Sequence, residues 1–145
     1  MTVQQILMQK GKRVIVVHRH TPVASAVETM RREAVGALVV SRNGREIQGL
    51  VSERDVIRAL VSRGVNRCLT MPVAGIMSCP VESCRPDDSL RWVLAAMTQQ
   101  RVRHMPVLKN GVLCGIVSIG DVVRQRLAEA ESEARVAREA SMDGR

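Results

Sequence analysis

Apolar residues recur along this chain with two different spacings, and the two spacings alternate in the same order in each half of the sequence. A helical spacing of i, i+3, i+4 and i+7 covers residues 23–30 and again residues 90–97. Each helical stretch leads into a short apolar run, GALVVS at 36–41 and HMPVLK at 104–109. Short apolar runs bounded by turn residues are typical of buried strands. The pattern therefore predicts a helix followed by a strand, twice.

Both predicted strands are followed by a turn that contains an Asn-Gly pair, within SRNGREIQ and LKNGVLC. Asn-Gly is the strongest short signal for a β-hairpin. A second strand follows each turn, in IQGLVS and LCGIVS, and then a second helical pattern. Further upstream, each half has a short helix (VQQILMQ; VAGIM) and a strand (RVIVVH; PVESC). Each half is therefore predicted to fold as β-α-β-β-α after a short leading helix.

The helices at 23–30 and 90–97 are each preceded by residues that are typical of helix starts. In the first half, we expect Thr21 to cap the helix, with Pro22 in the first helical position. In the second half, Asp87 or Asp88 is the expected cap. The two halves are thus predicted to begin equivalent helices with different residue types.

The two halves are a sequence duplication, most clearly in the heptapeptides GLVSERD (49–55) and GIVSIGD (115–121). Neither half is large enough to bury a sufficient core by itself, whereas two sheets packed face to face would share one. We therefore expect a mixed α/β (α+β) fold with pseudo-two-fold symmetry and two equivalent clefts between the halves. The expected boundaries are 1–65 for the first repeat, 70–128 for the second, and 129–145 for a polar tail that extends the last helix and frays.

The repeated Ser-x-x-Asp sequence has two interpretations. Ser52 with Asp55, like Ser118 with Asp121, has the capping-box spacing of a helix start. A helix start is also a ready site for anions, because its first backbone N–H groups have no partner within the helix. A carboxylate beside it supplies two acceptor oxygens, which suit the vicinal hydroxyls of a ribose. The residues alone leave both interpretations open, and the cap is compatible with the nucleotide site.

The doubled frame resembles the cystathionine-β-synthase (CBS) domain pair, also called the Bateman module. The resemblance rests on GALVVSRNGREIQGLVSERDVIRAL and RVRHMPVLKNGVLCGIVSIGDVVRQRL, and it covers residues 3–127. The SERD and SIGD forms look like those of the small stand-alone bacterial proteins of this family and of a similar plant organellar group. The resemblance implies that an adenine nucleotide such as AMP, ADP, ATP, NAD or S-adenosylmethionine binds in the clefts between the repeats.

Carried onto this sequence, the resemblance assigns roles to several residues. Asp55 and Asp121 would hold ribose hydroxyls, and the two serines of the motif would contact phosphate or ribose. The adenine ring would lie in an apolar slot against the middle strand of each half, at Gly36, Ala37 and Leu38 and at His104, Met105 and Pro106. The strands before the first helices would supply the other wall, around Val14 and Val81.

The two clefts are not expected to be identical, because the positions that follow the serines differ. Arg54, beside Asp55, is a candidate phosphate ligand, whereas Gly120 occupies the matching position of the second repeat. The cleft that Arg54 serves is therefore expected to prefer more phosphate. Weaker candidates for phosphate binding are Lys12, Arg13, Arg101 and Arg103.

Composition and charge narrow the classes of function. The net charge of +8 favours anionic partners, but no block of five like charges occurs and Trp92 is the single aromatic residue, which argues against a nucleic-acid partner. No catalytic motif is visible, so an enzyme is not expected. The four cysteines match no zinc framework, and His18 and His20 are expected to be free side chains. With no signal-peptide pattern and no membrane-length apolar run, we expect a cytoplasmic protein without a membrane partner.

From these features we expect a non-enzymatic sensor of adenine nucleotides that acts as a homodimer. Ligand binding would change how the halves pack and would signal to a protein partner in trans. Trp92 lies off the apolar stripe of its helix and is expected to contact the second subunit. The alternative is a protein-interaction module that regulates a partner, for example a redox protein, without sensing nucleotides.

Overall fold

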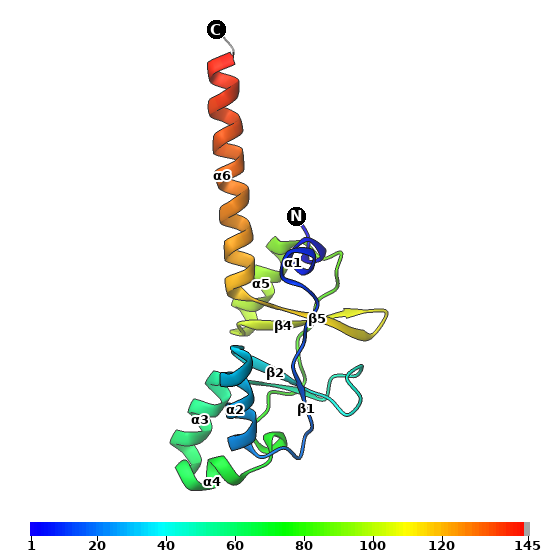
Figure 1. The fold of residues 1–145 in the computed structure, drawn as a ribbon, viewed down its shortest axis with the longest axis vertical. Coiled ribbons are helices and arrows are strands. Elements are labelled where there is room, and N and C mark those ends of the chain that lie inside the picture. Colours follow the sequence, from blue (N-terminus) through cyan, green and yellow to red (C-terminus); the bar gives the residue numbers. More distant parts are fainter. Residues whose placement is uncertain (144–145) are drawn as a thin grey trace.

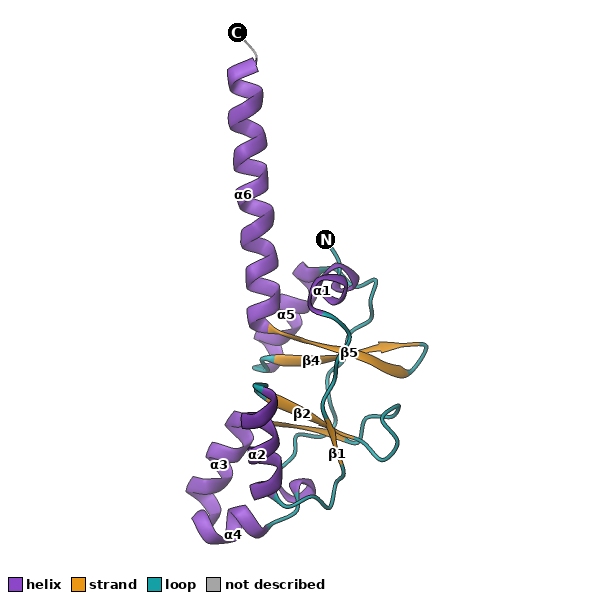
Figure 2. Ribbon diagram, in the orientation of Figure 1, coloured by secondary structure: helices purple, strands orange, loops and turns teal. Residues whose placement is uncertain are grey.

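The computed structural model describes residues 1–143 and has two halves stacked along its long axis (Figure 1). Each half contains one small sheet, and the two sheets face each other at the centre of the molecule (Figure 2). An N-terminal helix, α1 (Val3–Lys10), precedes both halves. The first half contains β1 (Val16–Val17), α2 (Val23–Glu33), β2 (Ala37–Val40), β3 (Gly49–Ser52), α3 (Glu53–Arg63), α4 (Val65–Thr70) and the 3-10 turn η1 (Val73–Gly75). The second half contains α5 (Leu90–Gln100), β4 (His104–Lys109), β5 (Val112–Ser118) and α6 (Ile119–Asp143).

The two sheets have the same strand arrangement, although one strand of the second sheet is reduced to a single bridge. β1 runs parallel to β2, which pairs antiparallel with β3, and β4 pairs antiparallel with β5. Cys84 forms an isolated parallel bridge to Val107. Both partners of this bridge lie 67 positions after those of the Val17–Val40 pair in the first sheet. The predicted mixed fold with an internal repeat is therefore confirmed. The prediction of a strand in PVESC is wrong, since only Cys84 of this segment pairs with β4. Pro80, at the start of the segment, has no N–H to donate to a strand.

The two Asn-Gly turns have different lengths. Asn110 and Gly111 both have positive φ (54° and 77°) and form the predicted tight turn between β4 and β5. The connection between β2 and β3 instead occupies residues 41–48, and only Gly44 of the first pair has positive φ (74°). The Ser41 hydroxyl accepts a hydrogen bond from the Gly44 N–H at 2.9 Å. This local side-chain bond stabilises a wider loop, so the first Asn-Gly pair does not form a tight hairpin.

Between residues 21 and 77 the structure differs from the predictions at three points. Helix α2 begins at Val23 with Pro22 as its cap residue, so Thr21 lies outside the helix and no side chain caps it. The short helix α4 was not predicted, because VNRCLT has no amphipathic spacing; it follows Gly64, whose φ of 84° ends α3. The helix expected in VAGIM is only the 3-10 turn η1.

The cap of α5 is also one residue away from the prediction. The Ser89 hydroxyl accepts a hydrogen bond from the Trp92 N–H at 3.0 Å and caps the helix. Asp88 instead accepts from the Arg85 N–H at 2.7 Å, which stabilises the turn before the helix. The carboxylate of Asp88 is therefore engaged in that turn, and neither it nor Asp87 is the cap residue.

Each half has its own apolar core. Each core also contains a short helical segment that, in the sequence, leads into the opposite half. Val3, Ile6 and Leu7 of α1 are almost fully buried in the core of the second half. Val73 of η1 lies in the core of the first half. The segments that follow α1 and η1 must therefore cross between the halves in opposite directions, as Figure 1 shows at the centre of the molecule.

A third apolar cluster lies between the two sheets. Ala37, Val39 and Leu50 of the first sheet are 0–7% exposed, and Val81 and Ile116 pack against them. This contact covers the sheet faces that would be exposed if either half were alone. The shared core that the size of the halves predicts is therefore present, built entirely from aliphatic side chains.

Helix α6 continues far beyond the body of the molecule (Figure 1). It has 25 residues, and those from 130 to 143 are all exposed. The predicted polar tail thus lies on this helix, apart from residues 144–145, which are outside the described part of the chain. Among the helices within residues 1–143, none combines the length and the apolar character needed to cross a membrane.

Gly115 of the second heptapeptide provides a test of how α1 is docked. A Cβ at this position would lie 2.7 Å from Cδ2 of the buried Leu7, whereas a Cβ at Gly120 would meet the flexible Arg124 side chain at 3.4 Å and Ser118 Oγ at an ordinary 3.6 Å. We expect Gly115→Ala to lower the free energy of unfolding by about 1–3 kcal/mol through overpacking. Gly120→Ala, in the first turn of α6, is expected to raise it by about 0.5–1 kcal/mol. Urea unfolding measures both, and equal effects would contradict this packing.

Candidate functional site

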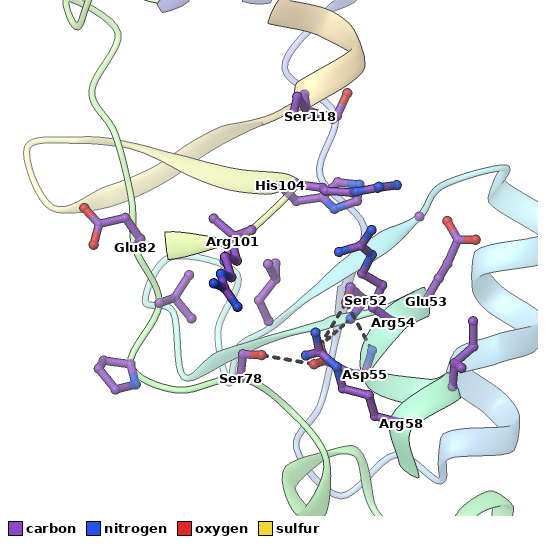
Figure 3. Close-up of a pocket in the computed structure, with 18 residues that line it drawn as sticks. Ser52, Glu53, Arg54, Asp55, Arg58, Ser78, Glu82, Arg101, His104 and Ser118 are labelled. Carbon is purple, nitrogen blue, oxygen red and sulfur yellow. Dashed lines mark hydrogen bonds between the residues drawn. The ribbon is translucent and has the colours of Figure 1, made fainter. Parts of the chain in front are cut away.

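A cavity of about 460 Å³ lies at the junction of the two halves (Figure 3). One wall is the first turns of α3, and the opposite wall is the turn between α5 and β4 together with the end of β5. The crossing segment that follows η1 forms a third side. The polar and charged residues that line the cavity are Ser52, Glu53, Arg54, Asp55, Arg58, Ser78, Glu82, Arg101, Arg103, His104 and Ser118. Both halves and one crossing segment thus contribute to a single site.

Ser52 and Asp55 form a capping box at the start of α3. Asp55 Oδ2 accepts hydrogen bonds from the Ser52 N–H (2.9 Å) and from the Ser52 hydroxyl (3.1 Å), and the Asp55 N–H donates to Ser52 Oγ (3.3 Å). The second carboxylate oxygen, Oδ1, accepts a hydrogen bond from the Ser78 hydroxyl at 3.1 Å. Because a hydroxyl rotates, a ligand hydroxyl can replace Ser78 on Oδ1 without disturbing the cap.

The backbone around Ser78 explains why its side chain reaches Asp55. Ser78 pairs with Leu50 of β3: the Leu50 N–H donates to the Ser78 carbonyl (3.1 Å), and the Ser78 N–H donates to the Leu50 carbonyl (2.8 Å). Gly49 allows this approach, since a Cβ there would lie 2.9 Å from Cγ of Met77 and 3.1 Å from the Ser78 carbonyl oxygen. The glycine of the first heptapeptide is therefore needed for close contact with the crossing segment.

Four arginines surround the same cavity. Arg54 and Arg58 are one turn apart on α3, and Arg101 and Arg103 lie across the cavity on the α5–β4 turn. All four side chains are on exposed residues, so their guanidinium groups are accessible. Guanidinium groups bind phosphate oxygens through paired N–H donors, and the N-terminus of α3 adds a favourable dipole. Two carboxylates that are not part of the cap, Glu53 and Glu82, also line the cavity.

His104 of the second half lies against Gly36 of the first half. A Cβ at Gly36 would be 3.2 Å from Nε2 of His104, so a larger residue there would press on the imidazole, whereas the nearby Glu53 carboxylate ends a flexible side chain that can move. Burial lowers the pKa of His104, and nearby Glu53 opposes this only in part. The imidazole is therefore neutral at pH 7, and it presents one donor and one acceptor nitrogen to the site.

Asp121, the counterpart of Asp55, does not line this cavity. Its Oδ2 accepts from the Ser118 N–H (2.8 Å) and from Lys10 Nζ (2.7 Å), and its Oδ1 accepts from Arg124 Nη2 (2.7 Å). Burial alone would raise the pKa of Asp121, but the hydrogen bonds from Lys10 and Ser118 outweigh burial and keep the pKa below its usual value. A smaller cavity of about 290 Å³ lies beside it, between α1 and α6.

The structure brings eight of the predicted site residues together and separates the others from them. The residues that line the larger cavity are Gly36, Ser52, Arg54, Asp55, Val81, Arg103, His104 and Ser118. The predicted strand residues Ala37, Leu38, Met105 and Pro106 are buried in β2 and β4, and Val14 packs between the sheets. Lys12 is exposed and lines neither cavity. Of the weaker candidates, Arg101 lines the larger cavity, whereas Arg13 is paired with Glu33.

Sequence reasoning missed several residues of these sites. Arg58 had a signal that could have been used, because it follows Arg54 by four positions on a predicted helix and must share its face. Ser78 and Glu82 had none, since they lie outside the repeated motif. Lys10 also had none, because 111 positions separate it from Asp121.

Cysteine and histidine side chains do not gather into a site. The rings of His18 and His20 lie 5.2 Å apart, and no group of three or more metal-ligating side chains occurs within residues 1–143. Burial raises the pKa of the Cys84 thiol to about 12, so it is inert at neutral pH. Cys79, in contrast, is exposed.

Comparisons with known proteins match this arrangement. The CBS domain profile matches residues 3–62 and 73–128. A mitochondrial CBS domain-containing protein of Arabidopsis thaliana, CBSX3, is 32% identical over 140 residues, which are 91% of this chain and 68% of that protein. A CBS-domain-containing protein of Agrobacterium tumefaciens superposes with a TM-score of 0.83 at 33% identity, covering 87% of this chain and 99% of the other.

A third relative was solved with a ligand. The CBS domain protein of Pyrobaculum aerophilum, in complex with AMP, superposes with a TM-score of 0.72 at 26% identity, covering 83% of this chain and 89% of that one. The two profile matches correspond to the two halves of the fold, and together they cover most of the sequence. The chain therefore belongs to the CBS domain family and carries two CBS domains.

Proposed function

We propose that this chain is a regulatory module that binds an adenine nucleotide in the cavity beside Asp55. The observation that carries the proposal is the meeting, in one cavity, of a capped carboxylate with an accessible oxygen and four arginines from both halves. The volume of about 460 Å³ is within the range of roughly 300–1,000 Å³ that is typical of small-molecule sites. The AMP complex of the Pyrobaculum relative supports the choice of ligand class.

Each part of a nucleotide has a matching group in the cavity. Asp55 Oδ1 accepts hydrogen bonds from the ribose hydroxyls in place of Ser78. The apolar lining residues Ile57, Val81, Val102 and Ile119 offer a slot for the adenine ring. The arginines bind the phosphates, and with four of them the site can accept more than one phosphate group. AMP is the first ligand to test, followed by ATP and NAD.

Signalling follows from the position of the cavity between the halves. A ligand that contacts α3 on one side and the α5–β4 turn on the other binds best to one relative arrangement of the halves. It therefore shifts the population toward that arrangement. The proposed output of this shift is a changed surface that a protein partner recognises in trans.

We further propose that two copies of the chain associate through their helices. Several large apolar side chains on α3, α5 and α6 are exposed, at 44–84%: Ile57, Val61, Trp92, Val123 and Leu127. These helices lie on one side of the two sheets, and the hairpin turns lie on the other (Figure 2). Exposed apolar patches of this kind mark protein–protein contacts, and a flat helical face suits a second copy.

Titration calorimetry with AMP tests nucleotide binding. We expect wild-type protein to bind AMP, and Asp55→Asn to weaken binding by about 10- to 100-fold, because a charged acceptor contributes about 1.5–3 kcal/mol. Asparagine keeps the shape of the cap, so the fold is retained. Asp87→Asn removes the same charge from an exposed position that lines neither cavity, and it is the matched control. If wild-type protein binds none of AMP, ATP and NAD, the interaction-module alternative is favoured.

Sedimentation velocity tests the homodimer. We expect the wild-type chain to sediment as a dimer and Val61→Glu to sediment as a monomer, because Val61 is 84% exposed on α3 and a charge there would be buried in the interface. Val136→Glu, at a 57% exposed position on the projecting part of α6, is the control and should remain dimeric. A monomeric wild-type chain, or a Val61→Glu dimer of unchanged affinity, would contradict the proposed surface.

A further inference from the structure

The two aspartates of the repeated motif face different chemical groups, although their caps are equivalent. Asp55 Oδ1 meets a neutral hydroxyl, that of Ser78. Asp121 meets two cations, Lys10 at 2.7 Å on Oδ2 and Arg124 at 2.7 Å on Oδ1. The side chain of Asp121 is only 9% exposed, so the Lys10 pair is screened less than a surface ion pair. The Asp55 carboxylate is therefore accessible to a ligand, whereas both oxygens of the Asp121 carboxylate already accept hydrogen bonds from cationic side chains.

The internal symmetry shows which residues cause this difference. Positions 67 apart are equivalent in the crossing segments, as the bridges at Val17 and Cys84 demonstrate. The counterpart of Lys10 is therefore Met77, which carries no charge, and the counterpart of Ser78 is Gly11. The Lys10 ammonium on Asp121 therefore comes from the last residue of α1 and has no charged equivalent in the first cleft.

The arginines of the first cleft are mostly missing from the second. The heptapeptides are 66 positions apart, so Arg54 corresponds to Gly120, and the offset of 67 that holds upstream relates Arg101 to Ala34 and Arg103 to Gly36. Arg58 corresponds to Arg124, which is bonded to Asp121. The second cleft thus lacks three of the four guanidinium groups, and its aspartate is neutralised from within the chain.

Lys10 is held in place by the packing of its helix. Ile6 and Leu7 of α1 are buried in the core of the second half, and Lys10 Nζ also donates to the Ile116 carbonyl at 3.0 Å. The ammonium therefore has two fixed acceptors, one of them a carboxylate. Lys10 binds Oδ2, the oxygen that also closes the cap, whereas Oδ1, the counterpart of the Asp55 oxygen that Ser78 contacts, is bound by Arg124. A ligand hydroxyl on Oδ1 must therefore displace Arg124 and share the carboxylate with Lys10, a charged donor that is a stronger partner than the hydroxyl itself.

We propose that Lys10 is a specificity-determining residue that occupies Asp121 in place of a ligand and restricts nucleotide binding to the Asp55 cavity. This inference rests on the proposed function, because it concerns how many nucleotides the same fold accepts. Its consequence is a stoichiometry of one nucleotide per chain, although the sequence contains the aspartate motif twice. Replacement of Lys10 by the residue at its symmetric position should open the second cleft.

Titration calorimetry with AMP on the full chain tests this assignment. We expect one AMP per chain for the wild type and two for Lys10→Met, with the second site weaker because three arginines are absent from it. Arg124 is 73% exposed, so its ion pair is easily exchanged and does not close the cleft by itself. Lys10→Arg keeps the cation on Asp121 and should bind one AMP. Lys109→Met makes the same substitution at an exposed residue of β4 that lines neither cavity, and it should also bind one.

The double variant Lys10→Met/Asp55→Ala separates this inference from the proposed function. It should bind one AMP, now at Asp121, whereas Asp55→Ala alone should bind at least ten-fold more weakly than the wild type. Two AMP molecules on the wild-type chain, or only one on Lys10→Met with unchanged helical circular dichroism, would overturn the role of Lys10. If the wild type binds no AMP but Lys10→Met binds one, the Asp55 site is wrong and the role of Lys10 stands. If neither binds AMP, both proposals fail.

Discussion

The contact between the two sheets is the interaction on which the rest of the structure depends. Val39 and Leu50 lie on the inner face of the first sheet, and they are buried in a cluster to which Val81 and Ile116 belong. Burial of apolar surface contributes roughly 25 cal/mol per Å², so this contact makes two small halves stable as one unit. The larger cavity lies beside this contact, so the packing that stabilises the fold also sets the separation of the cavity walls.

The crossing of the chain between the halves explains how a duplicated fold has two unequal clefts. The repeated heptapeptides place the caps of α3 and α6 in equivalent positions, and their hydrogen bonds are nearly the same. The segments outside the repeated motif are not constrained in this way: the segment after η1 brings Ser78 to one aspartate, and the end of α1 brings Lys10 to the other. The backbone symmetry is thus retained while the electrostatics of the two clefts differ.

Periodic features of this fold could be predicted from the sequence, whereas features that depend on distant contacts could not. The helices at 23–30 and 90–97, the Asn110–Gly111 turn and the capping boxes depend on local spacing, and the structure contains them. Ser89 rather than Asp88 caps α5, because the Asp88 carboxylate is already hydrogen-bonded in the preceding turn. The pair between Lys10 and Asp121 depends on how α1 packs on the opposite half, and no local pattern reports it.

Helix α6 has a mechanical consequence that its composition does not suggest. Its first turn contains Asp121, and its far end contacts none of the body of the molecule (Figure 1). At 1.5 Å per residue, its 25 residues make a rod of roughly 37 Å, so a tilt of about 5° at the base moves the tip by about 3 Å. A small rotation of the second half would therefore be amplified into a displacement of several ångströms at the exposed end of this helix.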